Sequence, residues 1–199
     1  LCLVGSEMCI RDSVYAMSLL SDIAKKFGYY DDAEILLENA VKFSPDDGEI
    51  RMKYALILRL KQKFTETMEQ VNILCEKFPD NLSYQAQKAS EIMQNGYHSE
   101  AIDLFEKIIK ENPYNFSAMT SKGHAEKTLG KTDKAIESYK SAYKIKNDHG
   151  EAYFSLSNLK TYKFSDKELD VMKNQLKRVD LTLKDKAVSY THLRAHETQ

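Results

Sequence analysis

Proline falls at a fixed spacing in this chain. The sequence contains three prolines, Pro45, Pro79 and Pro113, and each step between them is 34 residues. Self-similarity at a period of about 20–50 residues is typical of stacked supersecondary units, and a period of 34 indicates a helix–turn–helix repeat. Because proline cannot continue a helix and moves the residue before it out of the helical region, each proline is expected to end the second helix of one repeat.

The rest of the sequence follows the same register. If the first repeat starts at Val14, the others start at Gly48, Leu82, Phe116 and, in part, Gly150. Small residues then recur where two helices would cross, and glycine recurs at the turn between them. The eighth positions are Ser21, Ala55, Ala89, Gly123 and Ser157, the twentieth are Ala33, Thr67, Ala101 and Ala135, and the fifteenth are Gly28, Gln62, Gly96 and Gly130. A larger side chain at a crossing would push the backbones apart. The pattern predicts an all-α solenoid of helix–turn–helix hairpins over residues 14–164, wound into a right-handed superhelix.

This register resembles the tetratricopeptide repeat. The resemblance rests on the small eighth and twentieth positions, on the proline, and on a large twenty-fourth residue, which is Leu37, Val71, Phe105 or Tyr139. The second repeat departs from the family pattern with Thr67 and Leu74, and the fourth has Asn147 in place of proline. The resemblance implies that the first helix of each repeat lines a concave face. In that family, the second, fifth, ninth and twelfth positions of the first helix typically face a ligand.

The fifth repeat is interrupted. Its first helix is followed by residues 161–169, in which Ser165 and Glu168 have the spacing of a capping box before a new helix with Leu169, Met172, Leu176 and Val179 on one face. Residues 156–166, with Met172 beyond them, resemble the stretch after the repeats in bacterial proteins that join tetratricopeptide repeats to a C-terminal sulfotransferase domain. That resemblance implies that residues 165–187 begin a following element.

The two ends differ in character from the repeats. Residues 1–13 and 188–199 resemble translated sequencing-adapter ends and are predicted to be artefacts, so they are left out of the fold prediction. The alternative for residues 1–13 is a short apolar N-terminal segment. A signal peptide is disfavoured, because Glu7, Arg11 and Asp12 interrupt the apolar run.

Composition and motifs argue against a catalytic role. The 29 Lys and Arg balance 30 Asp and Glu, which disfavours nucleic-acid and anionic-membrane partners. Phosphate-binding and dinucleotide-binding glycine loops, Cys-x-x-Cys and His-Glu-x-x-His are absent from the sequence. Cys75 is read as a small core residue. The histidine pair His192 and His196 lies in the suspect tail. We therefore expect no catalytic residues, no metal and no cofactor, and a cytoplasmic bacterial protein fragment that is not itself an enzyme.

The remaining functional candidate is the predicted concave groove. Its expected ligand-binding residues are Met52, Arg59, Met93, His124, Lys127, Phe154 and Asn158. This set is mixed and mildly apolar, and it lacks the lysine and asparagine pattern that clamps a C-terminal carboxylate in chaperone-binding relatives. The expected function is a scaffold that binds a peptide or partner domain, as the repeat module of a sulfotransferase-type protein. The alternatives are a free-standing bacterial adaptor and the repeat region of a glycosyltransferase.

Overall fold

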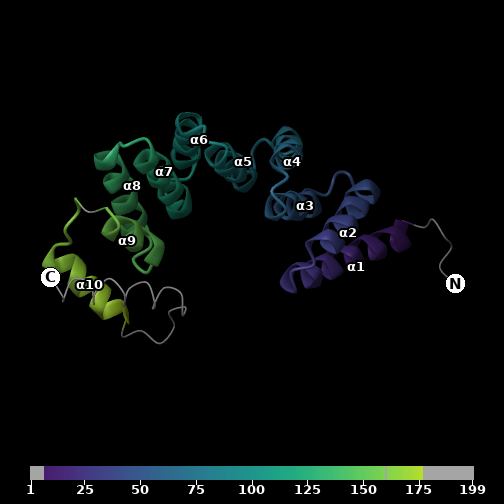
Figure 1. Cartoon of the computed structure of the whole chain (residues 1–199), viewed down its shortest axis with the longest axis horizontal. Coiled ribbons are helices and arrows are strands. Elements are labelled where there is room, and N and C mark those ends of the chain that lie inside the picture. The colour runs from purple at the N-terminus through teal and green to yellow at the C-terminus, as the bar shows by residue number, and fades with distance from the viewer. Residues whose placement is uncertain (1–6, 160, 177–199) are drawn as a thin grey trace. The chain divides into compact units, whose positions relative to one another are not determined.

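The described part of the chain is entirely helical. The computed structural model describes residues 7–159 and 161–176, and within them it contains ten α-helices and no β-strand (Figure 1). The helices are α1 (Glu7–Lys26), α2 (Tyr30–Phe43), α3 (Gly48–Leu60), α4 (Phe64–Lys77), α5 (Leu82–Gln94), α6 (His98–Glu111), α7 (Phe116–Thr128), α8 (Thr132–Ile145), α9 (Gly150–Ser157) and α10 (Asp166–Leu176). The predicted all-α hairpin architecture is confirmed, and the helix pairs α3–α4 to α7–α8 follow the 34-residue register. In the first pair, α2 and the end of α1 follow it too, but α1 begins at Glu7, before the predicted repeat start at Val14.

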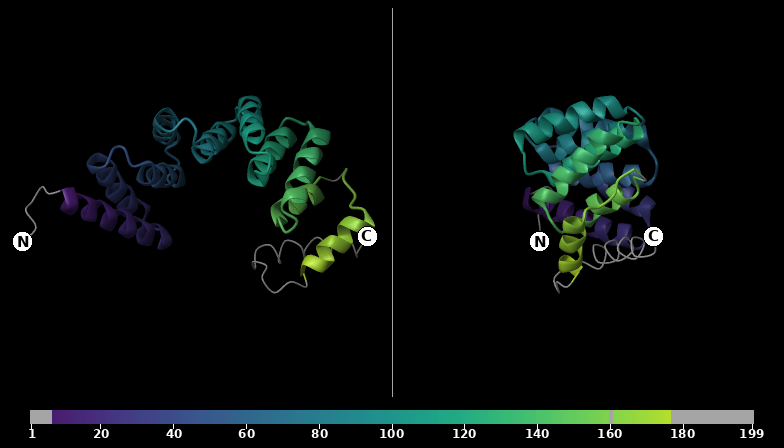
Figure 2. Two further views of the ribbon diagram at one scale, coloured as in Figure 1. Left: turned by 180° about the vertical axis from the view of Figure 1, so that it is seen from behind. Right: turned by 90° about the vertical axis from the view of Figure 1, so that its left-hand side faces the viewer.

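The chain divides into two compact units, an N-terminal unit of residues 1–91 and a C-terminal unit of residues 92–199. The boundary lies inside α5, and each unit is described here by itself. Within the C-terminal unit, α7 and α8 lie antiparallel and in contact (Figure 2). The right-handed superhelix concerns the placement of the whole stack and stays a prediction.

The turns inside the hairpins require a left-handed backbone. Gly28, Gly96 and Gly130 have φ of 81°, 91° and 74°. Gln62 occupies the equivalent place in the second repeat with φ of 60°. Glycine adopts this conformation without steric cost, whereas a side chain with a Cβ atom does not. The fifteenth position of each repeat is therefore selected by backbone geometry, and Gln62 is the strained member.

Replacing Gln62 by glycine should raise the free energy of unfolding by about 0.5–1 kcal/mol, because it relieves this strain. Gly96→Ala is the matched control at the same place in the next repeat and should lower stability. Urea melts of the two variants measure both effects. If Q62G melts at the wild-type urea concentration or below it, the turn at Gln62 is not strained.

Small residues lie at the helix crossings, as predicted. Ala33, Ala55, Ala101 and Ala135 are completely buried. At Gly123, an added Cβ atom would lie only 2.6 Å from the ring of Tyr139. Because interiors are close-packed, these positions have no room for a larger side chain.

The departure at Thr67 is accommodated by a local hydrogen bond. Its side chain is fully buried, and its hydroxyl donates to the carbonyl oxygen of Lys63, 2.8 Å away. A buried hydroxyl is tolerated when it has such a partner. Threonine can therefore take the place that alanine has in the other repeats.

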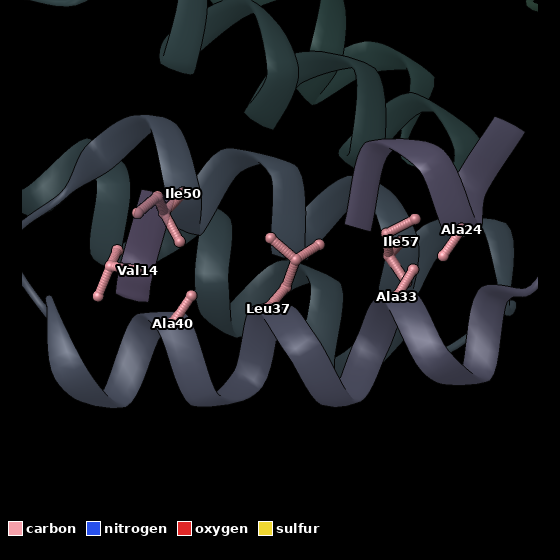
Figure 3. Close-up of a cluster of buried hydrophobic side chains, with 7 residues drawn as sticks. All are labelled: Val14, Ala24, Ala33, Leu37, Ala40, Ile50 and Ile57. Atoms are coloured by element: carbon pink, nitrogen blue, oxygen red, sulfur yellow. The ribbon is translucent and has the colours of Figure 1, made fainter. Parts of the chain in front are cut away.

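The core of the N-terminal unit forms where α1, α2 and α3 meet. Figure 3 shows its buried members, which are Val14, Ala24, Ala33, Leu37, Ala40, Ile50 and Ile57. Val14 and Ala24 come from one side of α1, so this side faces the other two helices.

Side-chain caps start several first helices after the predicted turns. Asp47 accepts from the backbone N–H groups of Glu49 and Ile50 at 3.0 and 3.1 Å, and Asn115 accepts from Ala118 at 3.0 Å. Asn81 caps α5 in the same way. These bonds satisfy backbone donors that have no partner inside the helix. The Asn-x-Ser sequences at residues 81 and 115 therefore act as helix caps.

The fifth repeat ends differently from the others. After the short α9, Tyr162 and Phe164 pack against a buried cluster that includes Tyr139 and Leu156, and α10 follows. The predicted capping box is present, since the N–H and hydroxyl of Ser165 each donate to Glu168 Oε2 at 2.8 Å. The apolar face predicted for the last helix is only partly described: Leu169 is half-buried, the side chains of Met172 and Leu176 are not described, and Val179 lies outside the described residues.

Candidate functional site

In the N-terminal unit, the candidate residues Met52 and Arg59 lie on α3 and are half-buried. Arg59 Nη1 lies 3.3 Å from Glu91 Oε1, and the Glu91 side chain is only 1% exposed. Gln87 also donates to Glu91 Oε1. A buried carboxylate requires such partners, because an isolated buried charge is strongly destabilising. Arg59 thus pairs with Glu91 through one nitrogen, and the other N–H groups of its guanidinium can donate to a ligand.

In the C-terminal unit, His124 connects three helices. Its Nδ1 lies 2.9 Å from the Tyr139 hydroxyl on α8, and its Nε2 lies 3.4 Å from Glu151 Oε1 on α9. Burial is the main cause that raises the pKa of Tyr139 to about 12, so the phenol stays neutral at physiological pH. His124 was predicted as a ligand contact, and both of its ring nitrogens face protein groups. His124 thus contacts both α8 and α9, and its role in ligand binding stays a prediction.

Other candidates in this unit are more accessible. Lys127 at the end of α7 and Asn158 after α9 are exposed, Phe154 on α9 is 44% exposed, and Met93 on α5 is half-buried. Among residues 7–159 and 161–176, no carboxylate forms an ion pair with Lys127. Lys127 therefore offers an ammonium group to an approaching ligand. The contact between His124 and Glu151 joins α7 to α9.

One position expected to face the ligand is buried instead. Thr120, the fifth residue of its repeat, is 3% exposed. Its hydroxyl donates to the carbonyl oxygen of Phe116 and lies 2.9 Å from His149 Nε2. The His149 ring packs edge-on against Phe116, with 4.9 Å between the centroids, and helps to cover Thr120. This face of the C-terminal unit thus begins at His124 and Lys127.

Sequence reasoning missed two buried carboxylates on first helices. Glu91 is described above, and Glu126 on α7 is 2% exposed. Ser138 donates to Glu126 Oε2 at 2.6 Å, and Lys122 Nζ lies 3.7 Å from Glu126 Oε1. Lys122 also pairs with Glu106 on α6 at 2.8 Å. These groups connect neighbouring helices. From sequence alone, Glu91 and Glu126 could equally well have been exposed surface residues.

Two hollows found in the described residues do not coincide with the candidate face. One lies at the turn of residues 77–82. The other, of about 260 Å³, is lined by Tyr143, Lys144, Asn147, Tyr153, Lys167, Glu168 and Val171. No cluster of three metal-ligating side chains occurs in the part of the chain that the structure describes. None of the described helices combines the length and apolarity that crossing a bilayer requires.

Comparison with known proteins supports the repeat assignment. Residues 116–149 match the model of the tetratricopeptide repeat family. The chain is also similar in fold to a thermophilic tetratricopeptide repeat protein of Thermus thermophilus, with a TM-score of 0.68, 21% identity, and coverage of 91% of this chain and 99% of the other. MamA of Desulfovibrio magneticus RS-1 is similar with a TM-score of 0.64 and 12% identity, and 94% of each chain is covered. At these identities the likeness shows the fold alone.

One curated relative is much longer than this chain. Over 95 residues, or 48% of this chain, the sequence is 30% identical to the probable UDP-N-acetylglucosamine–peptide N-acetylglucosaminyltransferase SPINDLY of Arabidopsis thaliana. The match spans about a tenth of the length of that relative. The matched family model and the solved structures support a tetratricopeptide repeat fold, and they leave the interaction role of this chain and the activity of any longer parent protein to proposal.

Proposed function

We propose that this chain binds an extended peptide or a partner domain through exposed residues of its first helices. The observation that carries the proposal is the exposure of Lys127 on α7, Phe154 on α9 and Asn158 just after α9, which supply a cation, an aromatic ring and an amide. An aromatic ring with nearby hydrogen-bonding groups is typical of binding surfaces. Met52 and Arg59 offer a similar mixture on α3 of the N-terminal unit, and Met93 and His124 complete the proposed set.

The partner we propose has moderate acidic character. Lys127 offers an ammonium group with no carboxylate paired to it in the described residues, and Arg59 keeps donors beyond its bond to Glu91. A carboxylate on the ligand would gain charge-assisted hydrogen bonds from these groups. Since the whole chain is close to neutral, with a formal net charge of −1, the surface does not favour a polyanion such as nucleic acid.

The place of this chain in a longer protein is a second part of the proposal. We propose that residues 14–164 are the repeat module of a bacterial, cytoplasmic sulfotransferase-type protein, on the basis of the sequence at residues 156–166 and 172, and that this module itself is not catalytic. The likeness to SPINDLY favours a second candidate, the repeat region of a glycosyltransferase. Sequencing an intact gene beyond Ala187 distinguishes the two candidates from a free-standing adaptor.

Charge reversal on the candidate face tests the binding proposal. Extended peptides selected from a display library on the wild-type chain are titrated against K127E, which should weaken binding about three- to tenfold through the lost attraction and the new repulsion. Lys134, exposed on the second helix α8 of the same hairpin, supplies the matched control K134E. Lys140 is unsuited to this purpose because its Nζ lies over the ring of Tyr162, 4.8 Å from the centroid.

The control decides the outcome. K134E should bind the selected peptides as the wild type does. If K134E loses as much affinity as K127E, the loss reflects net charge, and the first-helix face is not the binding surface.

A further inference from the structure

A hollow of about 260 Å³ lies between α8, α9 and α10 in the C-terminal unit. The side chains that line it include Tyr143 and Lys144 from α8, Tyr153 from α9, and Lys167 and Val171 from α10. Because an apolar cavity of about 150 Å³ is enough to hold benzene, this hollow has room for one six-membered ring with a substituent. None of the seven candidate groove residues is among the described residues that line it, so the hollow is separate from the proposed peptide-binding residues.

The fifth hairpin, which forms one side of the hollow, departs from the others. Its second helix, α10, begins at Asp166, 34 residues after α8 begins at Thr132. The twentieth position is Leu169, whereas Ala101 and Ala135 occupy it in the two preceding repeats. The first helix is also short, since α9 has 8 residues and α7 has 13. A leucine holds two crossing helices further apart than an alanine does, which agrees with the space beside α10.

The wall that α8 and α9 supply is aromatic and fixed in place. The rings of Tyr143 and Tyr153 are stacked, with 4.8 Å between their centroids and 18° between their planes. Tyr153 is 1% exposed, and the hydroxyl of Tyr143 donates to Glu168 Oε1 at 2.6 Å. Val171 of α10 adds an apolar side chain that is 42% exposed. Such a surface suits a flat ring, because aromatic rings favour stacked and edge-to-face contacts.

The uncompensated charge at the hollow is positive. Its carboxylate, Glu168, already accepts hydrogen bonds from two tyrosine hydroxyls and from the N–H and hydroxyl groups of Ser165. Lys144 and Lys167 are exposed, and neither forms an ion pair with a carboxylate of residues 7–159 or 161–176. Two ammonium groups are therefore available to an anion that enters the hollow.

We propose that this hollow binds an aromatic ring that carries a carboxylate. The ring lies against Tyr143 and Val171, and the carboxylate accepts charge-assisted hydrogen bonds from Lys144 and Lys167. Two sources supply this chemistry: a free aromatic acid, and the last residue of a peptide that ends in phenylalanine or tyrosine. Because α8 and α10 both line the hollow, the bound ligand links these two helices.

Titration of the full chain with phenylacetate, followed through the amide NMR signals, tests the proposal. The amides at the end of α8 and at the start of α10 should shift and saturate with a Kd of about 1 mM or lower. Acetate lacks the ring, and phenylacetamide lacks the charge. Each should bind at least about tenfold more weakly than phenylacetate, because each loses one of the two kinds of contact.

Two lysine variants locate the binding site. Lys144→Gln and Lys167→Gln should each weaken phenylacetate binding about three- to tenfold, because each removes one ammonium group. Lys134→Gln, at an exposed lysine of α8 that does not line the hollow, is the matched control and should bind as the wild type does. Since all three lysines are exposed, the variants should stay folded, which circular dichroism checks.

N-acetylphenylalanine carries its ring and carboxylate as the end of a peptide does, so it distinguishes the two sources. Tighter binding than that of phenylacetate supports a peptide terminus, and weaker binding supports a free acid. Three results would overturn the proposal: no saturable shift in α8 and α10 with either compound, equal binding of acetate and phenylacetate, or K144Q and K167Q variants that bind as tightly as K134Q.

Discussion

Replacing Ala135 by leucine should lower the free energy of unfolding by about 1–3 kcal/mol. Ala135 is completely buried in a cluster with Tyr139, Leu156 and Leu159, so three added heavy atoms have no space there. Ala101 occupies the equivalent crossing in the preceding repeat and is also completely buried, so Ala101→Leu should have a similar cost. Urea melts followed by helicity measure both effects.

An exposed position provides the control for this prediction. Glu137 lies on the same helix as Ala135, and Glu137→Leu adds a leucine on its solvent side. E137L should change the free energy of unfolding by less than about 0.5 kcal/mol. Wild-type or higher stability in both A101L and A135L would mean that the twentieth positions are not helix crossings and that the repeat register is wrong.

The second large effect on stability is expected from replacing Glu168, which holds α10 to the rest of the C-terminal unit. Its Oε1 accepts from the hydroxyls of Tyr143 and Tyr162 at 2.6 Å each, and its Oε2 accepts from Ser165. Partial burial alone would raise the pKa of Glu168, but these hydrogen bonds outweigh it and lower the pKa from 4.5 to about 2. Burial, followed by the Glu168 carboxylate, raises the pKa of both tyrosines, which therefore stay protonated as donors. The carboxylate thus fixes the start of α10 to α8.

Glu168→Gln should destabilise the attachment of α10 by about 1–2 kcal/mol at neutral pH, after allowance for partial exposure of the group. The amide nitrogen of glutamine cannot accept the hydrogen bonds that Oε2 accepts from Ser165. Because the folded pKa is depressed, the wild-type stabilisation is fully present above about pH 4.5. It is lost as the pH falls toward 2.

Hydrogen exchange of the α10 amides at pH 7 and at pH 3 measures this effect. E168Q should exchange faster than the wild type at pH 7, and the difference between them should shrink at pH 3. Asp170→Asn, at an exposed carboxylate of the same helix, is the control and should leave the protection of α10 unchanged. A difference between E168Q and the wild type that is equally large at both pH values would show that the carboxylate charge is not what holds α10.

Features of the fold that depend on backbone geometry were predictable from sequence. The prolines, the turn residues Gly28, Gly96 and Gly130, and the small crossing residues each satisfy a local steric requirement that only a few residue types meet. The Asn caps and the Ser165–Glu168 box are local in the same sense. The departures also have local reasons: Gln62 accepts strain at its turn, and the hydroxyl of Thr67 bonds to its own helix.

Features that depend on pairing between repeats were not predictable. Besides Gln87 and Lys122 on the same helices, the partners of His124, Glu91 and Glu126 lie between 12 and 32 residues away along the chain, on neighbouring helices. For a charged residue on a first helix, the sequence pattern does not distinguish an exposed position, such as that of Lys127, from a buried one, such as that of Glu126. The seven predicted groove residues therefore include accessible ones such as Lys127 and one, His124, whose ring nitrogens have internal partners. The binding role of the set stays a prediction.

The most direct test of the central claim is a hydrogen-exchange footprint of the full chain with a bound peptide selected from a library. The peptide should slow exchange chiefly in the first helices, which are α7 and α9 in the C-terminal unit and α3 in the N-terminal unit. The second helices α6 and α8 should exchange as they do in the free protein. Protection centred on α6 and α8, with α3, α7 and α9 unchanged, would contradict the claim that the first helices carry the binding face.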